Sequence, residues 1–395
     1  MRLIHTSDWH LGRSFHQVGL LSAQATFVDH LVDVVRAESV DAVLVSGDVY
    51  DRAMPAPDTV GLLSEAVTRL VDAGASVVLS SGNHDSAIRL GFASELLSRA
   101  GLHIRSRLDG VGEPVLVEGV AVYPLPYLEP ALVAEPLGAT ERTHAGVLSA
   151  AMDRVRADLA RRGGGPSVVM AHAFVSGGAT SDSERDISVG GVSAVHPRTF
   201  EGVDYVALGH LHGRQRVEES VRYSGSPLAL SFSEARHTKG SWLVDVDADG
   251  WVHAEAVDAP VPRPLAVLRG DLQDLLEDPV HRGAEEAWCQ VTLTDAVRPA
   301  GAMDQVRRRF PHTLELRFDP RGAAVPVQPY SRRATGESPL EVCCDFLGHV
   351  RSGRVATDAE RETLATAIEA VRTTRGELTD EGRLPAVAQR TEGAA

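Results

Sequence analysis

Residues 77–85 read VVLSSGNHD, an apolar run that passes into a small polar cluster. The apolar residues predict a buried strand, and α/β proteins usually place their chemistry at the carboxyl ends of strands. Asn83 offers a carbonyl oxygen to a metal ion, and His84 titrates near neutral pH. Gly-Asn is also ordinary turn chemistry, so this stretch alone is equally compatible with a plain turn. Its interpretation therefore depends on the other strand ends of the chain.

The same pattern recurs in two earlier segments. Residues 3–12 read LIHTSDWHLG, so Asp8 and His10 stand at i and i+2 of an extended segment and can face one site. Residues 41–52 read DAVLVSGDVYDR, another apolar strand that ends in a carboxylate, Asp48. Helical spacing between these strands, as over 24–37 and 58–73, predicts a layered α/β fold.

Two later strands end in histidine. Residues 167–172 read SVVMAH, and a lone His in the position of His172 is more often structural than a ligand. Residues 203–212 read VDYVALGHLH, which places His210 and His212 at i and i+2. Gly-His-x-His at a strand end is the more specific signal for metal binding.

The composition is that of a soluble globular chain. Its 395 residues are enough for about two or three domains, with 43% hydrophobic and 24% charged residues. No apolar run approaches the roughly 20 residues of a membrane-spanning helix, and the first residues lack a signal-peptide core. Three cysteines, two of them adjacent, make no disulfide framework. We therefore expect a cytoplasmic protein without a membrane segment.

The net charge of −15 argues at first against a nucleic-acid partner. Bound metal ions would neutralise some of the acidic groups, and a basic partner subunit could supply phosphate contacts. Arginine carries almost all of the positive charge, since Lys239 is the only lysine. A DNA substrate therefore stays compatible with the charge.

The second half of the chain predicts smaller units. A cluster of prolines around residue 262 marks a domain boundary, so we assign residues 1–262 to the main domain and 263–329 to a small α+β unit. The basic run Arg307–Arg309 in that unit could meet phosphate, but a solvated helix end explains it better.

Two helices are predicted after a linker at 330–337. Ser338 and Thr357 each begin a capping box, and an apolar stripe follows each of them. We assign the linker and helices to residues 330–376, and expect the helices to dock on the upstream domains or on another protein. The polar residues 377–395 predict a disordered tail.

Taken together, the strand ends favour a single site, because separate chance explanations would all have to hold at once. Oxygen and nitrogen ligands without a thiolate suit two hard-to-borderline divalent ions such as Mn²⁺ or Fe²⁺. Asp48 is the best candidate for a carboxylate shared by two ions. The expected ligands are Asp8, His10, Asp48, Asn83, His172, His210 and His212.

These stretches resemble the calcineurin-like metallophosphoesterases and, more narrowly, the SbcD-type nucleases of bacterial SbcCD complexes. Residues 223–228, which read YSGSPL, the small α+β unit and the tail helices carry the narrower resemblance. It spans residues 1–375. The resemblance implies a four-layer β-sandwich flanked by helices, a DNA-binding α+β capping domain and a C-terminal helical tail.

The resemblance also implies a role for each residue of the site. One metal ion would be held by Asp8, His10, Asp48 and His212, and the other by Asp48, Asn83, His172 and His210. His84 would be the general acid at the leaving oxygen, and Asp85 would orient it. Some relatives carry a second phosphate-contacting His where this chain has Asp51, which we interpret as a supporting residue because a carboxylate repels phosphate. The expected metal is Mn²⁺, with Mg²⁺ or Fe²⁺ as alternatives.

The implied function is that of a metal-dependent DNA nuclease, a double-strand exonuclease and single-strand or hairpin endonuclease in DNA end processing, replication, repair and recombination. The implied partners are DNA, an SbcC-type coiled-coil ATPase gripped by helices at 338–350 and 358–373, and a second copy of the chain within a heterotetramer at the nucleoid. The chain has no Gly-x-x-x-x-Gly-Lys-Ser/Thr motif, so any ATP dependence would come from the partner.

Two other functions stay open. A small-molecule metallophosphoesterase, such as a cyclic-nucleotide phosphodiesterase, would use the same ions and explain the acidic charge, but not the capping unit or the tail helices. A catalytically silent scaffold would bury charged ligands without a metal ion, which is costly. Comparing cleavage of duplex DNA with turnover of a small phosphodiester distinguishes the nuclease from the first of these.

Overall fold

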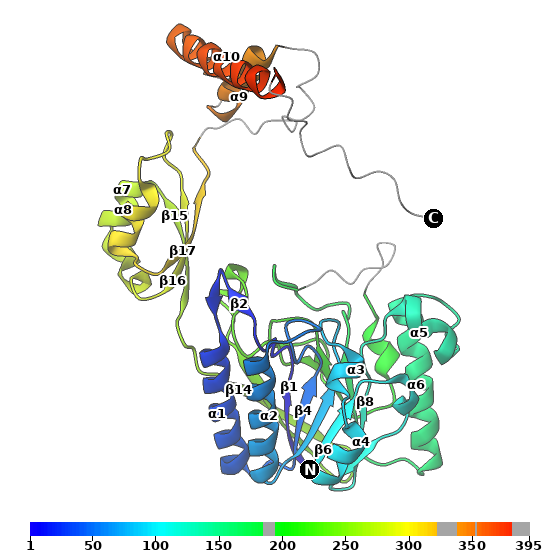
Figure 1. Ribbon diagram of the computed structural model, residues 1–395. Helices are drawn as coiled ribbons and strands as arrows, with labels where there is room; N and C mark the ends of the chain where they lie inside the picture. The colour runs from blue at the N-terminus through cyan, green and yellow to red at the C-terminus, as the bar shows by residue number, and fades with distance from the viewer. Residues whose placement is uncertain (185–193, 322–337, 352–353, 381–395) are drawn as a thin grey trace. The chain divides into compact units, whose positions relative to one another are not determined.

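The computed structural model describes residues 1–184, 194–321, 338–351 and 354–380 (Figure 1). It divides into two compact units, of which the first comprises residues 1–269, 273–292 and 303–317. The second comprises residues 270–272 and 293–302 and, from residue 318 onward, the described residues 318–321, 338–351 and 354–380. The predicted linker at 330–337 and residues 381–395 of the predicted tail lie outside the described residues.

A six-stranded mixed sheet forms around the N-terminal strand. The strands that enter the predicted site run parallel to each other, and two antiparallel strands extend the sheet at one edge. All five residues of the strand at Ala42–Ser46 are buried, as expected for a parallel strand that is covered on both faces. In spatial order the strands are β14 (Val252–Asp258), β13 (Gly240–Val246), β1 (Arg2–Thr6), β4 (Ala42–Ser46), β5 (Ser76–Ser80) and β6 (Leu102–Arg105).

A second six-stranded sheet packs against the first. Its four central strands are parallel, and a short antiparallel strand lies at each edge. In spatial order the strands are β11 (Gln215–Arg216), β12 (Val221–Tyr223), β10 (Tyr205–Gly209), β9 (Ser167–His172), β8 (Val120–Pro124) and β7 (Val115–Val117).

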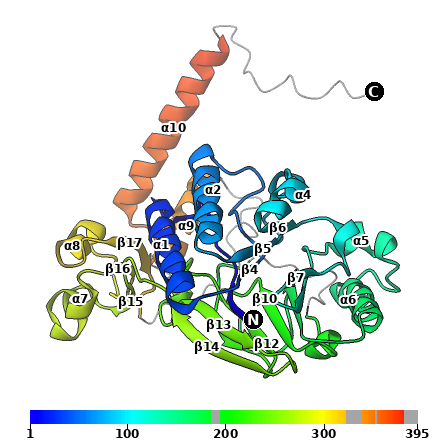
Figure 2. The same ribbon diagram turned by 90° about the horizontal axis from the view of Figure 1, so that it is seen from below.

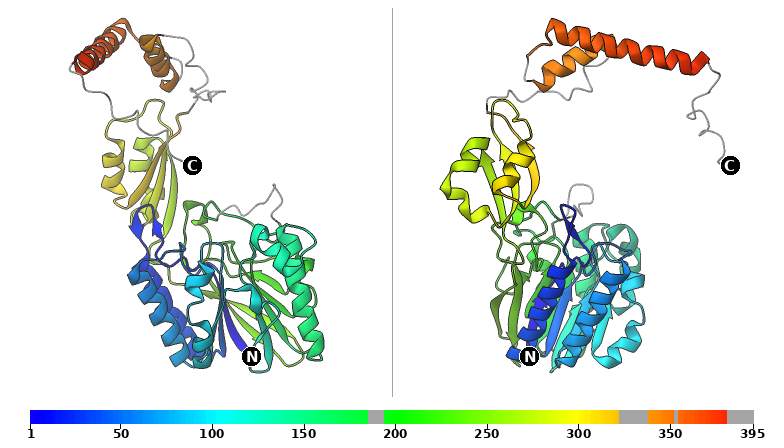
Figure 3. Two further views of the ribbon diagram at one scale, coloured as in Figure 1. Left: turned by 45° about the vertical axis from the view of Figure 1, so that its right-hand side comes forward. Right: turned by 60° about the vertical axis from the view of Figure 1, so that its left-hand side comes forward.

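Helices cover the outer faces of both sheets. Helices α1 (Leu21–Glu38) and α2 (Pro57–Asp72) pack on the first sheet, and α5 (Pro130–Leu137) and α6 (His144–Arg161) pack on the second (Figures 1 and 2). The two views in Figure 3 show the same layers from other sides. The helices predicted over 24–37 and 58–73 correspond to α1 and α2.

Three apolar clusters hold these layers together. One lies between α1, α2 and the first sheet, and another between α5, α6 and the second sheet. The third lies between the two sheets and joins residues such as Leu44 and Val78 to Val168 and Met170. The predicted four-layer α/β sandwich is therefore confirmed.

Shorter elements complete the main domain. A two-stranded hairpin follows β1, and two helices of one turn each follow β5. These elements are β2 (Ser14–Phe15), β3 (Val18–Gly19), α3 (Ala87–Leu90) and α4 (Ser94–Leu97), with 3-10 turns at Ser98–Ala100, Leu108–Gly110, Pro197–Phe200 and Phe232–Glu234.

Residues 265–318 form the predicted α+β arrangement. A three-stranded sheet is made of β15 (Leu265–Gly270), β16 (Trp288–Leu293) and β17 (Thr313–Phe318). The connections carry α7 (Leu272–Glu277), a 3-10 turn (Pro279–Ala284) and α8 (Ala302–Arg309). The basic run ends α8, and its Arg307 side chain donates to the carbonyl of Thr313, which supports the interpretation of a helix end.

The two capping boxes form as predicted at α9 (Pro339–Val350) and α10 (Asp358–Asp380). The Ser338 hydroxyl accepts from the N–H of Glu341 at 3.3 Å, and the Glu341 carboxylate accepts from the N–H of Ser338 at 3.2 Å. Thr357 and Glu360 exchange the equivalent bonds at 3.4 and 2.9 Å.

The predicted start of the tail at residue 377 is wrong, because α10 continues to Asp380. Polar composition suggested disorder there, but good helix formers such as Glu377 and Leu378 can extend an existing helix without an apolar face. Among the described residues, no helix has the length and apolar character that crossing a membrane requires.

Candidate metal centre

The predicted site residues meet where the central strands of both sheets end. Asp8 and His10 follow β1, Asp48 follows β4, and Asn83 follows β5 in the first sheet. His172 is the last residue of β9, and His210 and His212 follow β10 in the second sheet. Apart from Asn83, which is partly exposed, these side chains belong to buried residues. Both sheets are therefore needed to build one site.

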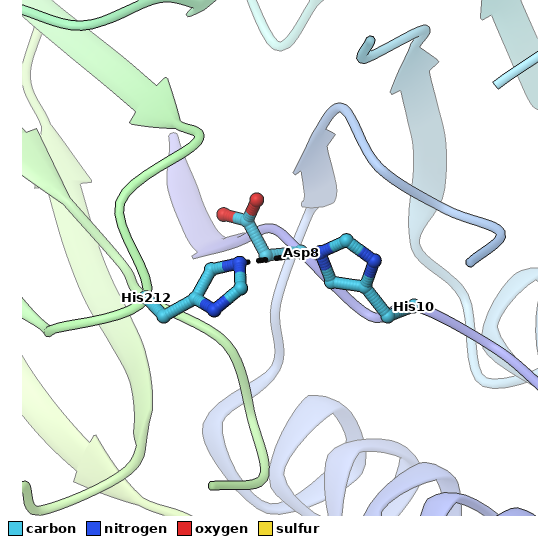
Figure 4. A group of neighbouring side chains, drawn as sticks. All are labelled: Asp8, His10 and His212. Carbon is cyan, nitrogen blue, oxygen red and sulfur yellow. Dashed lines mark hydrogen bonds between the residues drawn. The ribbon is translucent and has the colours of Figure 1, made fainter. Parts of the chain in front are cut away.

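One group of potential ligands consists of Asp8, His10 and His212, drawn in Figure 4. One ligand atom of each lies within 4.8 Å of those of the others. The Nε2 atoms of His10 and His212 are only 3.2 Å apart. The Asp8 carboxylate is fixed by the backbone N–H of His210 at 3.1 Å and by the Ser7 hydroxyl at 2.5 Å.

Asp48 lies at the middle of the site. Its Oδ2 is 3.5 Å from Nε2 of His10 and 3.5 Å from Nε2 of His172, which come from different sheets. Burial raises the pKa of Asp48, but the positive charge of the neighbouring histidines, His172 first, lowers this pKa further, to well below its usual value. Asp48 is thus an ionised carboxylate. It belongs to two neighbouring groups of potential ligands, one with His10 and His84 and one with Asp8 and His172.

His172 tests whether the residues fit a cation. Its Nδ1 lies 3.0 Å from the carbonyl of Ser46, which can only accept, so Nδ1 carries a hydrogen. Its Nε2 faces Asn83 Oδ1 at 3.0 Å. If the ring were neutral, Nε2 would be an acceptor, so two acceptors, Nε2 and Oδ1, would face each other at this distance. Burial lowers the pKa of His172, but the charges of Asp48 and Asp8 raise it to about 9. The site therefore attracts a positive charge to this point, and its donor set fits a divalent cation.

Among the predicted histidine and aspartate ligands, His210 is the one that joins no three-residue group of potential ligands in the described part of the chain. Its ring packs edge-on against the ring of His172, with centroids 5.3 Å apart. Burial, followed by the charge of His172, lowers the pKa of His210 well below its usual value, so the ring is neutral. A neutral imidazole beside His172 is suited to donate a lone pair to a metal ion.

His84 points one ring nitrogen into the site. Its Nδ1 donates to the backbone carbonyl of Asp51 at 2.8 Å, which leaves Nε2 facing inward, 3.9 Å from Asp48 Oδ2. Its backbone N–H donates to Asp48 Oδ1 at 2.9 Å. This geometry leaves Nε2 of His84 facing the potential ligands.

The predicted orienting contact from Asp85 to His84 is wrong. The Asp85 carboxylate instead accepts from the backbone N–H groups of Gly82, Val49 and Tyr50, at 2.9, 3.1 and 2.9 Å. Burial, followed by the charge of Asp48, raises the pKa of Asp85 to about 7. Asp85 therefore ties the loop after β4 to the loop after β5, and the Asp51 carbonyl takes over the orienting contact.

The prediction that Asp51 is a supporting residue agrees with its contacts. Its carboxylate lies 3.6 Å from Nδ1 of His10 and 3.2 Å from the Arg13 guanidinium. Burial raises the pKa of Asp51, but His10 and Arg13 lower it below its usual value. Asp51 thus places a negative charge beside the His10 ring and holds His84 through its main-chain carbonyl.

Backbone geometry around the site is unusual. Asp8, His10, Asp48 and His210 all have positive φ, at 51°, 43°, 49° and 104°. Such conformations cost energy in residues other than glycine and concentrate at functional sites. A methyl group at Gly82 would come within 3.0 Å of Asp48 Oδ1, so the two loops approach more closely than a side chain allows.

Sequence reasoning missed three residues behind His212. Ser183 contacts Nδ1 of His212 at 2.5 Å, and Glu234 and Lys239 lie buried behind Ser183. The available signals were the long polar loop after β9 and the single lysine of the chain, but neither predicts a contact with His212.

This fold and this donor set define a metallophosphoesterase. Residues 1–214 match the model of the calcineurin-like phosphoesterases, so the chain belongs to that family. Residues 261–351 match the SbcD C-terminal domain model, described as the type 5 capsule protein repressor C-terminal domain. Together the two matches are those of an SbcD-type nuclease.

The chain shows only weak similarity to the following solved structures. One solved structure is 12% identical over 65% of this chain and 98% of its own, with a TM-score of 0.35. The psychrophilic beta-glucosidase BglU from Micrococcus antarcticus is 14% identical over 80% and 82%, with a TM-score of 0.22. A family 1 beta-glucosidase from Thermotoga maritima, in complex with isofagomine lactam, is 10% identical over 80% and 82%, with a TM-score of 0.19.

Proposed function

We propose that this metal-dependent phosphoesterase is a DNA nuclease that hydrolyses phosphodiesters with two divalent metal ions. The observation that carries the proposal is Asp48, an ionised carboxylate whose Oδ2 lies 3.5 Å from ligand nitrogens of both sheets. A carboxylate in this position can be shared by two ions. In this proposal the DNA is cut by exonuclease action on duplex ends and by endonuclease action on single strands or hairpins.

Each of the two ions takes ligands from both sheets. We assign Asp8, His10, Asp48 and His212 to one ion, and Asp48, Asn83, His172 and His210 to the other. Nitrogen and oxygen donors without thiolate favour Mn²⁺, with Mg²⁺ or Fe²⁺ as alternatives. When bound, such ions neutralise charge on the phosphate and lower the pKa of bound water.

His84 supplies the proton for the leaving oxygen. The Asp51 carbonyl holds its Nδ1–H, so the transferable proton is the one on Nε2, which faces the site. Asp48 Oδ2 lies 3.9 Å from that nitrogen and stabilises the protonated ring before transfer. Positioned general acids of this kind typically contribute about 10²–10⁴-fold to the rate.

An SbcCD-type complex follows from the C-terminal domain, and we propose that α9 and α10 bind the coiled coil of its ATPase. Phe346, Val355 and Val371 expose apolar surface on and between these helices. An apolar helix face left uncovered is suited to a partner helix. The complex would act in the cytoplasm at the nucleoid, in DNA end processing, repair, recombination and replication, with residues 263–329 as the capping, DNA-binding domain.

We also propose that the nuclease subunit is a homodimer through helices of the main domain. Ile88 and Phe92, on and beside α3, are 88% and 80% exposed, and Leu96 on α4 is 65% exposed. A largely apolar groove of 480 Å³, lined in part by Leu63 and Val67 of α2, lies beside them. Contiguous exposed apolar surface of this kind marks interaction sites, and a second copy offers a matching apolar patch. Phe92→Glu should convert dimers to monomers in light scattering, and a monomeric wild-type chain would contradict this assignment.

One assay tests the nuclease. End-labelled duplex DNA is incubated with the chain and Mn²⁺ or Mg²⁺, with and without the coiled-coil ATPase, beside a small chromogenic phosphodiester. Metal-dependent shortening of the duplex supports the proposal, and the Asp48→Asn variant controls for contaminating nucleases. Fast turnover of the small substrate without DNA cleavage in any arm would instead favour a small-molecule phosphodiesterase, and no turnover of either would favour a silent scaffold.

A further inference from the structure

Behind His212 lies a buried ion pair that the proposed mechanism does not use. Glu234 and Lys239 are 1% and 6% exposed, and Lys239 is the only lysine in the chain. The ammonium of Lys239 donates to the Glu234 carboxylate, to the His212 carbonyl at 2.7 Å and to the Ser226 hydroxyl at 3.0 Å. All three of its N–H groups therefore have an acceptor, so the buried ammonium is fully hydrogen-bonded.

The other Glu234 oxygen connects to the ring of His212 through a hydroxyl. Ser183 Oγ lies 2.5 Å from Glu234 Oε1 and 2.5 Å from Nδ1 of His212. The Lys239 ammonium donates to Oε2 of Glu234, so Glu234 is an ionised carboxylate that can only accept. The Ser183 hydroxyl must then donate to Glu234, and its oxygen must accept a hydrogen from Nδ1 of His212.

This direction of hydrogen bonding selects one tautomer of His212. With hydrogen on Nδ1, the lone pair of the neutral ring is on Nε2, the atom that lies 3.2 Å from Nε2 of His10. The main chain is held as well, because the His212 N–H donates to Glu184 at 2.8 Å and its carbonyl accepts from Lys239. Ring tautomer, ring direction and backbone are thus all fixed from behind.

We infer that Glu234 and Lys239 are positioning residues that act through Ser183 to keep Nε2 of His212 ready to bind a metal ion. This inference deepens the proposed function and rests on it, since it assumes that His212 is a ligand. Partners of this kind behind a metal-binding histidine typically change metal affinity about 10- to 100-fold when they are removed. Among the described residues, Ser183 is the one whose side chain joins the ion pair to the ring.

The experiment compares Ser183→Ala with Ser181→Ala in the full chain. Both serines lie on the same loop and both contact Glu234, Ser181 at 3.4 Å. Ser181 also contacts Ser183 Oγ at 3.0 Å and Glu184 at 2.8 Å, but of these two serines only Ser183 reaches the His212 ring in the described part of the chain. Titration calorimetry measures the Kd for Mn²⁺ alone. Long-range ¹H–¹⁵N spectra of the metal-free protein report the tautomer of His212, assigned with a His212→Gln sample.

The expected result is specific to Ser183. Wild type should hold hydrogen on Nδ1 of His212, and Ser183→Ala should mix the tautomers and raise the Kd for Mn²⁺ by about 10- to 100-fold. Ser183→Thr, which keeps a hydroxyl, should restore both properties, and Ser181→Ala should change neither. Glu234→Gln combined with Lys239→Met removes both charges together and should reproduce the effect without leaving a buried unpaired charge.

Several outcomes would overturn the inference. Hydrogen on Nε2 in the wild type, an unchanged tautomer and Kd in Ser183→Ala, or equal effects of Ser181→Ala and Ser183→Ala would each do so. A wild-type chain that binds no Mn²⁺ would refute the proposed function instead, and the tautomer comparison in the metal-free protein would still test the hydrogen-bond relay.

Discussion

The metal centre and the pair of C-terminal helices are held together in opposite ways. In the centre, contacts join residues far apart in sequence, such as His10 and His212, which are separated by 202 positions. In the helices, the defined polar contacts are local, as in the capping boxes of Ser338 with Glu341 and Thr357 with Glu360. The centre is therefore a property of the whole main domain, whereas the start of each helix is specified by residues close in sequence, and apolar side chains such as Val371 stay exposed.

Asp48→Asn is the strongest test of the centre. The change removes the shared negative charge but keeps the size of the side chain, so turnover of a small phosphodiester with Mn²⁺ should fall by about 10³-fold or more. The control is Asp58→Asn, the same change on a carboxylate at the start of α2, and it should retain activity. A tenth or more of the wild-type rate in Asp48→Asn would show that the carboxylate is not essential.

His84→Gln should separate chemistry from metal binding. Loss of the general acid should lower the cleavage rate by about 10²–10⁴-fold, while the calorimetric affinity for Mn²⁺ stays at the wild-type value. His30→Gln, in α1 and away from the site, provides the matched control. A wild-type cleavage rate in a His84→Gln protein that binds Mn²⁺ would end the proposed acid role.

Gly82→Ala tests how closely the loops of the centre must approach. The new methyl group would come within 3.0 Å of Asp48 Oδ1 and of the Asp48 backbone nitrogen, so Asp48 has to move. We expect weaker Mn²⁺ binding, by about 10-fold if the shift costs the centre about 1.4 kcal/mol.

Gly61→Ala is the matched control, because nothing lies within 4 Å of the added methyl group in α2. It should leave Mn²⁺ binding unchanged and raise the free energy of unfolding slightly, since alanine favours a helix more than glycine does. Equal Mn²⁺ affinity in Gly82→Ala and Gly61→Ala would show that the close approach is not required.

The smallest effect is expected in the helices. The Thr357 N–H, followed by Arg351, lowers the pKa of Glu360 from 4.5 to about 2. The cap therefore stabilises α10 fully above the unfolded pKa and loses this stabilisation as pH falls through about 2. Helical circular dichroism should decrease slightly over this range in the wild type but not in Glu360→Gln, and identical pH profiles would contradict the capping contribution.

The same contrast explains what could be predicted from the sequence. Capping boxes are local patterns, so Ser338 and Thr357 revealed both helix starts. The potential ligands could be grouped because parallel strands end at the same edge of a sheet, which places Asp8 beside Asp48 in the first sheet and His172 beside His210 in the second. The meeting of these two groups depends on how the sheets pack, which the strand ends alone do not specify.

What could not be predicted depends on the main chain or on long-range side-chain contacts. The Asp85 carboxylate binds three backbone N–H groups, and the partner of the His84 ring is the backbone carbonyl of Asp51. Every residue has such groups, so no residue pattern points to them. The contact of Ser183 with Glu234 spans 51 positions, and the two belong to segments with no sequence signal in common.

Because the centre is built from both sheets, it can be completed only late in the synthesis of the main domain. At about 5–20 residues per second, His212 is synthesised about 10–40 s after His10, which lies 202 positions earlier. Until then the nascent chain holds Asp8, His10 and Asp48 without His212. A chain that stops before residue 212 cannot form the complete centre, so under the proposed two-metal assignment full metal loading would distinguish finished molecules from truncated ones.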